Sequence, residues 1–348
     1  MDTLAFGATA ALVGLVAGLL LGLSARLGNF CTLGALEMAV YGKDQKRLRL
    51  WGIVLAVAIF GTFATEAAGW LDVSETFYHS IAWNPIASIF GGLVFGYGMA
   101  LAGNCGFGAL VRFGGGDLRS LVVVVVMGVF GFVTLSGPIA PLRVTLFPQG
   151  GSGGDQGLAD LLAHAVGIPP LLTASVIALA FLIWALRYRP LREDRAELAW
   201  GVVAGFAVVL SFAGTYWLNQ QSMGDIQVEG LSFTAPVGRT ILFLMTSTAG
   251  GINFSVGAVI GVMAGALAGS LWRGMFRWEA CEDPRELGRQ VGGAALMGIG
   301  GVIALGCSVG QGVSAFATLA WSAPVTLAAI AAGAIFGLRR LIGASNHD

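Results

Sequence analysis

Apolar stretches about as long as a bilayer crossing recur along the whole chain. Uninterrupted spans lie at 5–24, 51–71, 120–140, 170–186 and 198–218. Three longer apolar segments, at 85–111, 237–271 and 290–338, contain polar residues and clustered glycines in their interiors. The pattern predicts an all-α polytopic integral membrane protein, with about nine transmembrane helices plus broken or re-entrant segments.

The loops between these segments alternate in charge. Sixteen of the 19 Lys and Arg residues fall in five segments, at 43–49, 112–119, 187–195, 273–289 and 339–340. Loops rich in Lys and Arg remain in the cytoplasm. We therefore expect these five segments inside the cell, and the loops 72–84, 141–168 and 219–236 outside.

Composition agrees with a membrane protein and excludes several other classes. Only 11% of the 348 residues are charged and the mean hydropathy is +0.81, whereas about a quarter of residues are charged in soluble domains. The net charge of zero gives no case for nucleic-acid binding. The first residues lack a basic stretch with a cleavage site, and no Walker motif occurs, so we expect neither a removable signal peptide nor ATP coupling within the chain.

One pattern occurs twice along the chain. Gly-x-Gly, six further residues and Cys-x-x-Gly form Gly96, Gly98, Cys105 and Gly108 in one copy and Gly298, Gly300, Cys307 and Gly310 in the other. Asn-Phe-Cys at 29–31 is likewise echoed by Asn-Phe-Ser at 253–255. The repeats predict one membrane domain over 1–348, with pseudo-repeat halves at about 1–140 and 198–340 that are linked by 141–197.

The relation between the halves follows from the charge pattern. The first cysteine segment descends from outside and the second rises from the cytoplasm, which an inverted repeat predicts. Both Asn-Phe segments, however, run toward a basic loop, which fits a parallel relation. We expect an inverted repeat, with the parallel relation as the alternative.

The two repeated cysteines are the principal candidate site. Irregular backbone at membrane depth is tolerated only where protein or a cavity satisfies it, and broken helices form the midplane sites of transporters. A single membrane cysteine usually fills a packing gap, but the repeated polar surroundings favour a function. The candidate path residues of these two segments are Cys105, Cys307, Asn104, Gln311, Gly108 and Gly310.

The remaining cysteines carry weaker signals. Cys31 lies in a third polar break, and its sequence counterpart is Ser255, a small hydrogen-bonding residue; function and packing explain both equally well. Cys281 lies in a charged loop and is expected to be incidental. The absence of Cys-x-x-Cys argues against a thioredoxin-like pair and a zinc site, so we expect neither metal nor cofactor. Glu66 is expected at the membrane interface rather than in a site.

The three cysteine segments, in this order and over nearly the whole chain, resemble the motifs of the YeeE/YedE family of sulfur-compound transporters. The resemblance implies a transport domain that takes up thiosulfate across the bacterial inner membrane through a narrow central path. It also implies that Cys31, Cys105 and Cys307 line this path, and that a small cytoplasmic TusA-like sulfur carrier is a partner. Some members handle other sulfur or selenium species, which remain alternative substrates.

The chemistry of the residues is compatible with this function. Thiosulfate is a dianion with a soft terminal sulfur, and conduction requires several weak sites rather than one strong site. Neutral thiols are weak donors and soft acceptors, so they can pass the ion along without covalent bonds. Two other classes stay open: a thiol-redox or persulfide-forming sulfur-transfer protein, and an accessory subunit in which the cysteines only pack.

Overall fold

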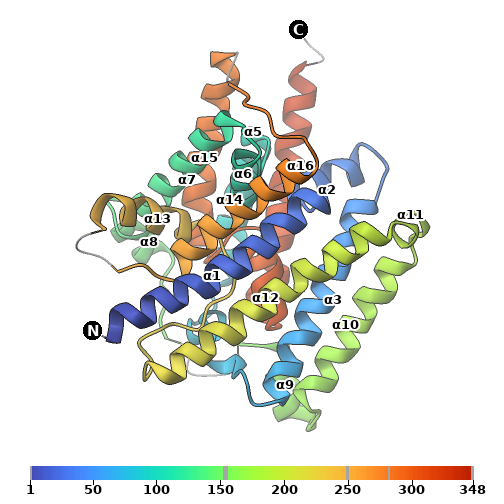
Figure 1. Cartoon of the computed structure of the whole chain (residues 1–348), viewed down its shortest axis with the longest axis vertical. Helices are drawn as coiled ribbons and strands as arrows, with labels where there is room; N and C mark the ends of the chain where they lie inside the picture. Colours follow the sequence, from blue (N-terminus) through green and yellow to red (C-terminus); the bar gives the residue numbers. More distant parts are fainter. Residues whose placement is uncertain (1, 152–155, 248–250, 281–282, 346–348) are drawn as a thin grey trace.

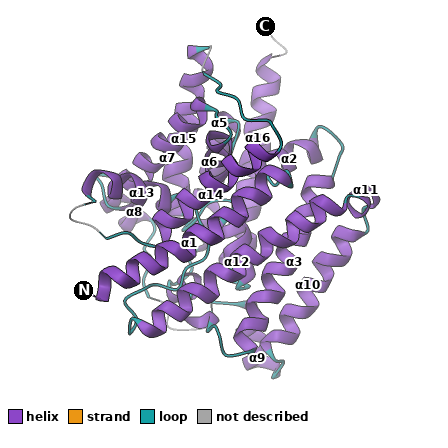
Figure 2. Cartoon of the chain, in the orientation of Figure 1, coloured by secondary structure: helices purple, strands orange, loops and turns teal. Residues whose placement is uncertain are grey.

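The predicted all-α class is confirmed in a computed structural model, which describes residues 2–151, 156–247, 251–280 and 283–345. Every regular element in these ranges is a helix (Figure 2). Seven helices of the described residues are long and apolar enough to cross a membrane, and two shorter apolar helices accompany them at Pro170–Leu186 and Ala235–Thr246. The protein is therefore a polytopic α-helical membrane protein.

Long helices alternate with short ones along the chain. The long helices are α1 (Asp2–Leu27), α3 (Lys46–Ala67), α5 (Pro85–Ala102), α7 (Leu118–Leu135), α10 (Pro170–Leu186), α12 (Arg195–Gln221), α14 (Phe254–Trp272), α15 (Pro284–Ile303) and α16 (Ser322–Ser345). The short elements are α2 (Thr32–Val40), η1 (Val73–Glu75), α4 (Phe77–Ser80), α6 (Gly106–Gly114), α8 (Ala140–Leu146), α9 (Leu158–Val166), α11 (Arg189–Glu193), α13 (Ala235–Thr246) and the π-helical turn η2 (Gly310–Ala315).

Polar side chains fix where several long helices begin. Asn84 accepts a hydrogen bond from the backbone N–H of Ala87 at the start of α5, and Asn253 accepts one from Val256 at the start of α14, both at 3.1 Å. The first N–H groups of a helix have no partner within the helix, so such caps stabilise its start by about 1 kcal/mol. The Asn of the second Asn-Phe motif is thus a helix cap.

Glycines set the distance between α1 and α14, which lie side by side and run parallel (Figure 1). Both helices present glycines at four-residue intervals, at 14, 18 and 22 on α1 and at 257, 261, 265 and 269 on α14. A Cβ at Gly18 would lie 2.3 Å from the carbonyl oxygen of Ala258, and one at Gly261 would lie 2.3 Å from that of Leu15. Small residues at this spacing let membrane helices approach closely.

The helices that lead to the two repeated cysteines run in opposite directions. Gly98 of α5 faces Gly293 of α15, whereas Gly91 faces Gly300, so α5 and α15 are antiparallel. The segment containing Cys105 follows the end of α5, and the segment containing Cys307 follows the end of α15. The chain therefore reaches the two cysteines from opposite sides of the molecule, as the charge pattern predicted.

The main helix contacts also pair up between the two halves. Suppose that four helices of the first half, α1, α3, α5 and α7, correspond to α12, α14, α15 and α16 of the second half, in that order. The contact between α1 and α14 then corresponds to the contact between α12 and α3. The contact between α5 and α16 likewise corresponds to the contact between α15 and α7. The contacts α1–α12 and α5–α15 map onto themselves, and both pairs are antiparallel. We propose that residues of about 1–140 and 198–340 form inverted repeats; α10, in the linker 141–197, has no counterpart in this correspondence.

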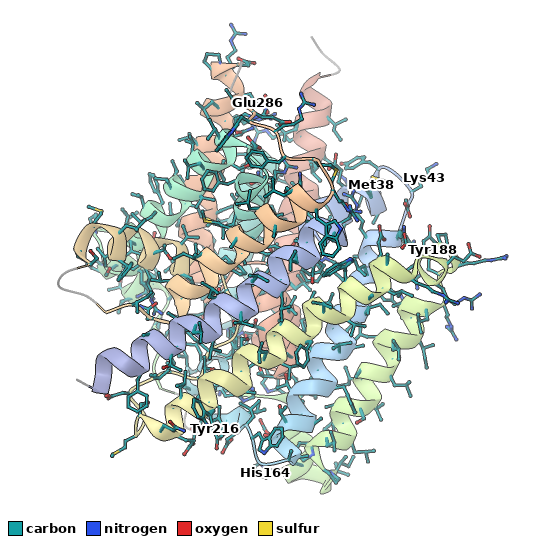
Figure 3. All side chains as sticks on the ribbon, in the orientation of Figure 1. Met38, Lys43, His164, Tyr188, Tyr216 and Glu286 are labelled. Carbon is teal, nitrogen blue, oxygen red and sulfur yellow. The ribbon has the colours of Figure 1, made fainter. Side chains whose placement is uncertain are left out.

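The loops gather on two sides according to their charge. On one side, Lys46 pairs with Asp194 at 2.9 Å, and Arg119 pairs with Glu279 at 3.5 Å. On the other side, backbone hydrogen bonds join 72–84 to 219–236 and to 141–168. Lys43 and Glu286 accordingly lie toward one end of the molecule and Tyr216 toward the other (Figure 3).

The glycine seam gives a direct test of the packing. We expect Gly261→Ala to destabilise the protein by about 1–3 kcal/mol, because its Cβ would meet the Leu15 carbonyl oxygen and force α1 and α14 apart. Gly292→Ala in α15 is the matched control, since nothing lies within 4 Å of a Cβ at that position. Thermal unfolding of both purified variants in detergent measures the difference, and equal melting temperatures would contradict the seam.

Candidate functional site

Each of the three motif cysteines follows a sharp break in the chain. The residue two positions before each cysteine has a left-handed backbone, with φ of 55° at Asn29, 72° at Gly103 and 57° at Leu305. Asn and Gly adopt this conformation readily, whereas for a leucine it costs about 1–2 kcal/mol. The three breaks end α1, α5 and α15, and a short helical segment begins at or soon after each cysteine.

The spacing Cys-x-x-Gly corresponds to a capping geometry. The Cys105 sulfur accepts a hydrogen bond from the backbone N–H of Gly108 at 3.3 Å, and the Cys307 sulfur accepts one from Gly310 at 3.4 Å. Cys31 is the residue that precedes α2 and has an extended backbone, without such a side-chain cap bond. Two of the thiols therefore satisfy N–H groups that a break inside a membrane would leave without a partner.

The sulfurs of Cys31 and Cys105 face the same small space. A Cβ at Gly108 would lie 3.5 Å from the Cys105 sulfur and 3.8 Å from the Cys31 sulfur. Cys105 is fully buried and Cys31 is half-buried. The absence of a side chain at Gly108 therefore leaves a gap that both thiols border.

The breaks that contain Cys31 and Cys307 are joined as well. Thr32 donates a hydrogen bond to the Ser308 hydroxyl at 3.1 Å, which links the residues directly after the two cysteines. The Cys307 sulfur is buried, one residue before Ser308. The structure therefore brings the three motif cysteines, which are far apart in sequence, into one central cluster.

Aromatic rings join the segments that contain Cys31 and Cys105. Phe107, two residues after Cys105, lies 6.3 Å from the ring of Phe30 and 5.2 Å from the ring of Phe233. Phe30 in turn stacks on Trp51 of α3 at 4.8 Å. Because Phe30 precedes Cys31 directly, these ring contacts fix the cysteine segments relative to the helices around them.

Two predicted polar residues are in the same region. Asn104 is buried, and its side-chain oxygen has no hydrogen-bond partner among the described residues. Gln311 donates from its amide to the carbonyl oxygens of Ala304 and Leu305, at 3.1 and 3.2 Å. Gln311 thus stabilises the break at the end of α15, and its own buried oxygen is also without a partner in the described chain.

Ser255 forms hydrogen bonds with two charged residues rather than with a thiol. Its hydroxyl accepts a hydrogen bond from Arg239 at 3.2 Å and donates one to Glu229 at 3.4 Å. Near Cys307, the small hydroxyl group comes instead from Ser232, whose oxygen lies 3.9 Å from the Cys307 sulfur. Cys281 lies outside the residues that the structure describes.

The sequence did not single out several residues near the thiols. Ser232 and the Tyr78 hydroxyl both adjoin Gly310, since a Cβ there would lie 2.6 and 3.4 Å from their oxygens. At Gly34, a Cβ would lie 3.8 Å from the Cys31 sulfur and 2.8 Å from a guanidinium nitrogen of Arg47. Ser232 and Tyr78 belong to loop segments without a motif, so no sequence signal marks them.

A cavity of about 130 Å³ adjoins the break before Cys307, on the side of the loops that are poor in Lys and Arg; Leu305 and Gly306 line it, and Cys307 itself does not. Its lining includes Ser232, Gly306, Glu229 and Arg239. Burial raises the pKa of the Glu229 carboxyl, and the charge of Arg239 and the hydrogen bond from Ser255 act in the opposite direction. Arg239 had a detectable signal, because it is a lone arginine in an apolar helix away from the basic loops.

The site contains neutral, soft and small groups at its centre and charged groups at its two ends. No three His, Cys, Asp or Glu side chains in the described ranges converge to hold a metal ion. Buried thiols, backbone N–H groups and glycine gaps can bind a small anion weakly at successive points. Together with the membrane-spanning helices, these features suit a membrane transport protein.

The comparisons with known proteins agree. The family model described as "Sulphur transport" matches residues 27–336, so the chain belongs to this family, which includes the YeeE/YedE proteins. The thiosulfate transporter TsuA of Escherichia coli K12 is 27% identical over 323 residues, which cover 89% of this chain and 88% of the relative. TsuA of Spirochaeta thermophila is 26% identical over 323 residues, covering 90% and 94%.

Proposed function

We propose that the protein takes up thiosulfate, or a closely related sulfur anion, across the bacterial inner membrane through the cluster of Cys31, Cys105 and Cys307. Thiosulfate is the cargo named in both relatives, which match this chain over most of its length. The observation that carries the proposed path is the gap at Gly108, which the sulfurs of Cys31 and Cys105 border together.

The order of the groups gives the path a direction. The cavity lined by Ser232, whose oxygen lies 3.9 Å from the Cys307 sulfur, is on the side poor in basic residues, and we infer that the ion enters there. From Cys307 it would pass to the gap that Cys105 and Cys31 border. Arg47 adjoins Cys31 at the opposite end, in one of the basic segments that are expected in the cytoplasm. An ion that follows this order moves inward.

Weak successive contacts support transport better than one strong site. A buried arginine at the centre would hold a dianion firmly, and conduction needs binding that is weak enough for release. Each thiol offers one weak S–H donor, and the positive ends of the short helices α2 and α6 add a partial charge at Cys31 and Cys105. Selectivity for sulfur anions then follows from contact between soft atoms.

Delivery of the ion inside the cell would involve a cytoplasmic partner. A small TusA-like sulfur carrier is the partner that the family resemblance implies. The basic segment around Arg47 is on the expected cytoplasmic side, and Arg47 adjoins Cys31 there. We propose that such a carrier binds beside this segment.

A covalent persulfide step is the second candidate, because two thiols border one gap. In that case, the sulfane sulfur of thiosulfate would bond to one cysteine sulfur and sulfite would leave with the electron pair of the broken S–S bond. The thiol would lose its proton to water in this step. Mass spectrometry of protein that has transported thiosulfate would then show one added sulfur atom on a motif cysteine.

Filling the gap tests the path directly. We expect Gly108→Ala to leave stability unchanged, because its Cβ would make ordinary contacts of 3.5 and 3.8 Å with the two sulfurs. Uptake of labelled thiosulfate should nevertheless fall about tenfold or more, since one added methyl group in a narrow site costs about 1–3 kcal/mol. Gly292→Ala serves as control, and undiminished uptake by Gly108→Ala at equal abundance would contradict the path.

Removal of single thiols tests their role. In cells without other uptake routes, we expect at least two of Cys31→Ala, Cys105→Ala and Cys307→Ala to reduce thiosulfate uptake roughly three- to tenfold at normal membrane abundance. Each change removes one hydrogen-bonding group of about 1 kcal/mol from the path. Full uptake in all three variants would leave the cysteines with a packing role only.

A further inference from the structure

The cavity beside the break before Cys307 contains a charged group that the thiol path does not use. Arg239 is in the first half of α13, an otherwise apolar helix. Its side chain is 39% exposed and contributes to the lining of the cavity. A solute in the cavity can therefore reach this guanidinium before it reaches Cys307.

Two neighbouring side chains position Arg239 but use only part of its hydrogen-bond donors. Its Nη1 donates to the Ser255 hydroxyl at 3.2 Å and lies 3.8 Å from a carboxylate oxygen of Glu229. Ser255 also donates to the other Glu229 oxygen at 3.4 Å. A guanidinium has five N–H donors, and within the described chain these are the polar contacts of Arg239, so most of its donors are available to a ligand in the cavity that it lines.

The geometry points to an outer anion site, in which Arg239 binds the oxygen face of an incoming tetrahedral dianion and Glu229 limits the strength of that binding. This inference rests on the proposed function and extends it by naming where the ion is first bound. The ligand class is a doubly charged oxyanion, so sulfate, which has the same charge and shape, should bind there as well.

Arginine suits this task because its planar fork donates two parallel hydrogen bonds to adjacent oxygens of an oxyanion. A bound thiosulfate oriented by its oxygens would direct its terminal sulfur away from Arg239. Ser232, in the same cavity, lies 3.9 Å from the Cys307 sulfur and provides the next contact. The site would thus orient the ion before the first thiol.

Glu229 has the opposite effect on the ion. Its side chain is 22% exposed and lines the same cavity, so when it is ionised its negative charge acts on both Arg239 and the bound dianion. A guanidinium without a carboxylate beside it would hold a dianion more tightly, and a transported ion must leave each site readily. The pair therefore attracts the ion while still allowing its release.

The test compares uptake kinetics of charge variants in cells, with membrane abundance measured for each. We expect Arg239→Gln to raise KM for thiosulfate about tenfold, as loss of about 1.4 kcal/mol of binding would do, with little change in Vmax. Glu229→Gln should lower KM several-fold. Arg239→Lys retains the positive charge but not the planar guanidinium, so it should give an intermediate KM. This variant also controls for the case in which Arg239→Gln fails to fold.

Arg143→Gln is the matched control. Arg143 of α8 is also on the side poor in basic residues, but it binds Thr134 and Gln149 and does not line the cavity. Its removal changes the outer charge by the same amount, so an unchanged KM in this variant separates local binding from general attraction of anions. Sulfate should inhibit uptake in the wild type and lose this effect in Arg239→Gln.

A binding measurement separates this inference from the proposed function. Anions that bind the folded protein raise its melting temperature by mass action, whether or not they are transported. Stabilisation of the wild type by sulfate and thiosulfate, lost in Arg239→Gln but kept in Arg143→Gln, would support the outer site even if cells took up no thiosulfate. Equal KM and equal stabilisation in wild type and Arg239→Gln, or a higher KM in Glu229→Gln, would overturn the site.

Discussion

The structure depends on one constraint. Helices α1, α5 and α15 end inside the helical bundle, and the backbone N–H and C=O groups freed at these three ends need hydrogen-bond partners there. Water is absent from the hydrocarbon region, so each unsatisfied group costs several kcal/mol. The sulfurs of Cys105 and Cys307 accept two of the free N–H groups, and Gln311 donates to two of the free carbonyls. The groups that stabilise the breaks are thus also the groups that line the proposed path.

The sequence predicted the framework of this site well. Regular apolar lengths identified the membrane class, and the repeated Cys-x-x-Gly spacing identified residues that the fold brings together. The spacing is informative because it reflects local geometry, in which a cysteine caps the N–H three residues later. A local capping motif of this kind can be recognised from residue spacing alone, without knowledge of tertiary contacts.

The residues around the cavity near Cys307 could not be predicted from the sequence in the same way. Ser255 matches Cys31 in the sequence echo, yet the structure places Ser255 beside Arg239 and Ser232 beside Cys307. The two Asn-Phe motifs do not occupy equivalent places, because one follows the end of α1 and the other caps the start of α14. Which loop residue reaches Cys307 depends on tertiary packing between distant segments, and no local pattern specifies this.

Charge is distributed along the proposed path in a way that suits a mobile anion. Arg239 is opposed by Glu229 at one end, Arg47 adjoins Cys31 at the other, and the thiols between them carry no formal charge when protonated. The most direct test is an anomalous-scattering map of crystals soaked in selenosulfate, in which selenium replaces the terminal sulfur. The account predicts a selenium peak within about 4 Å of at least one motif thiol. Peaks confined to sites away from Cys31, Cys105 and Cys307 would contradict it.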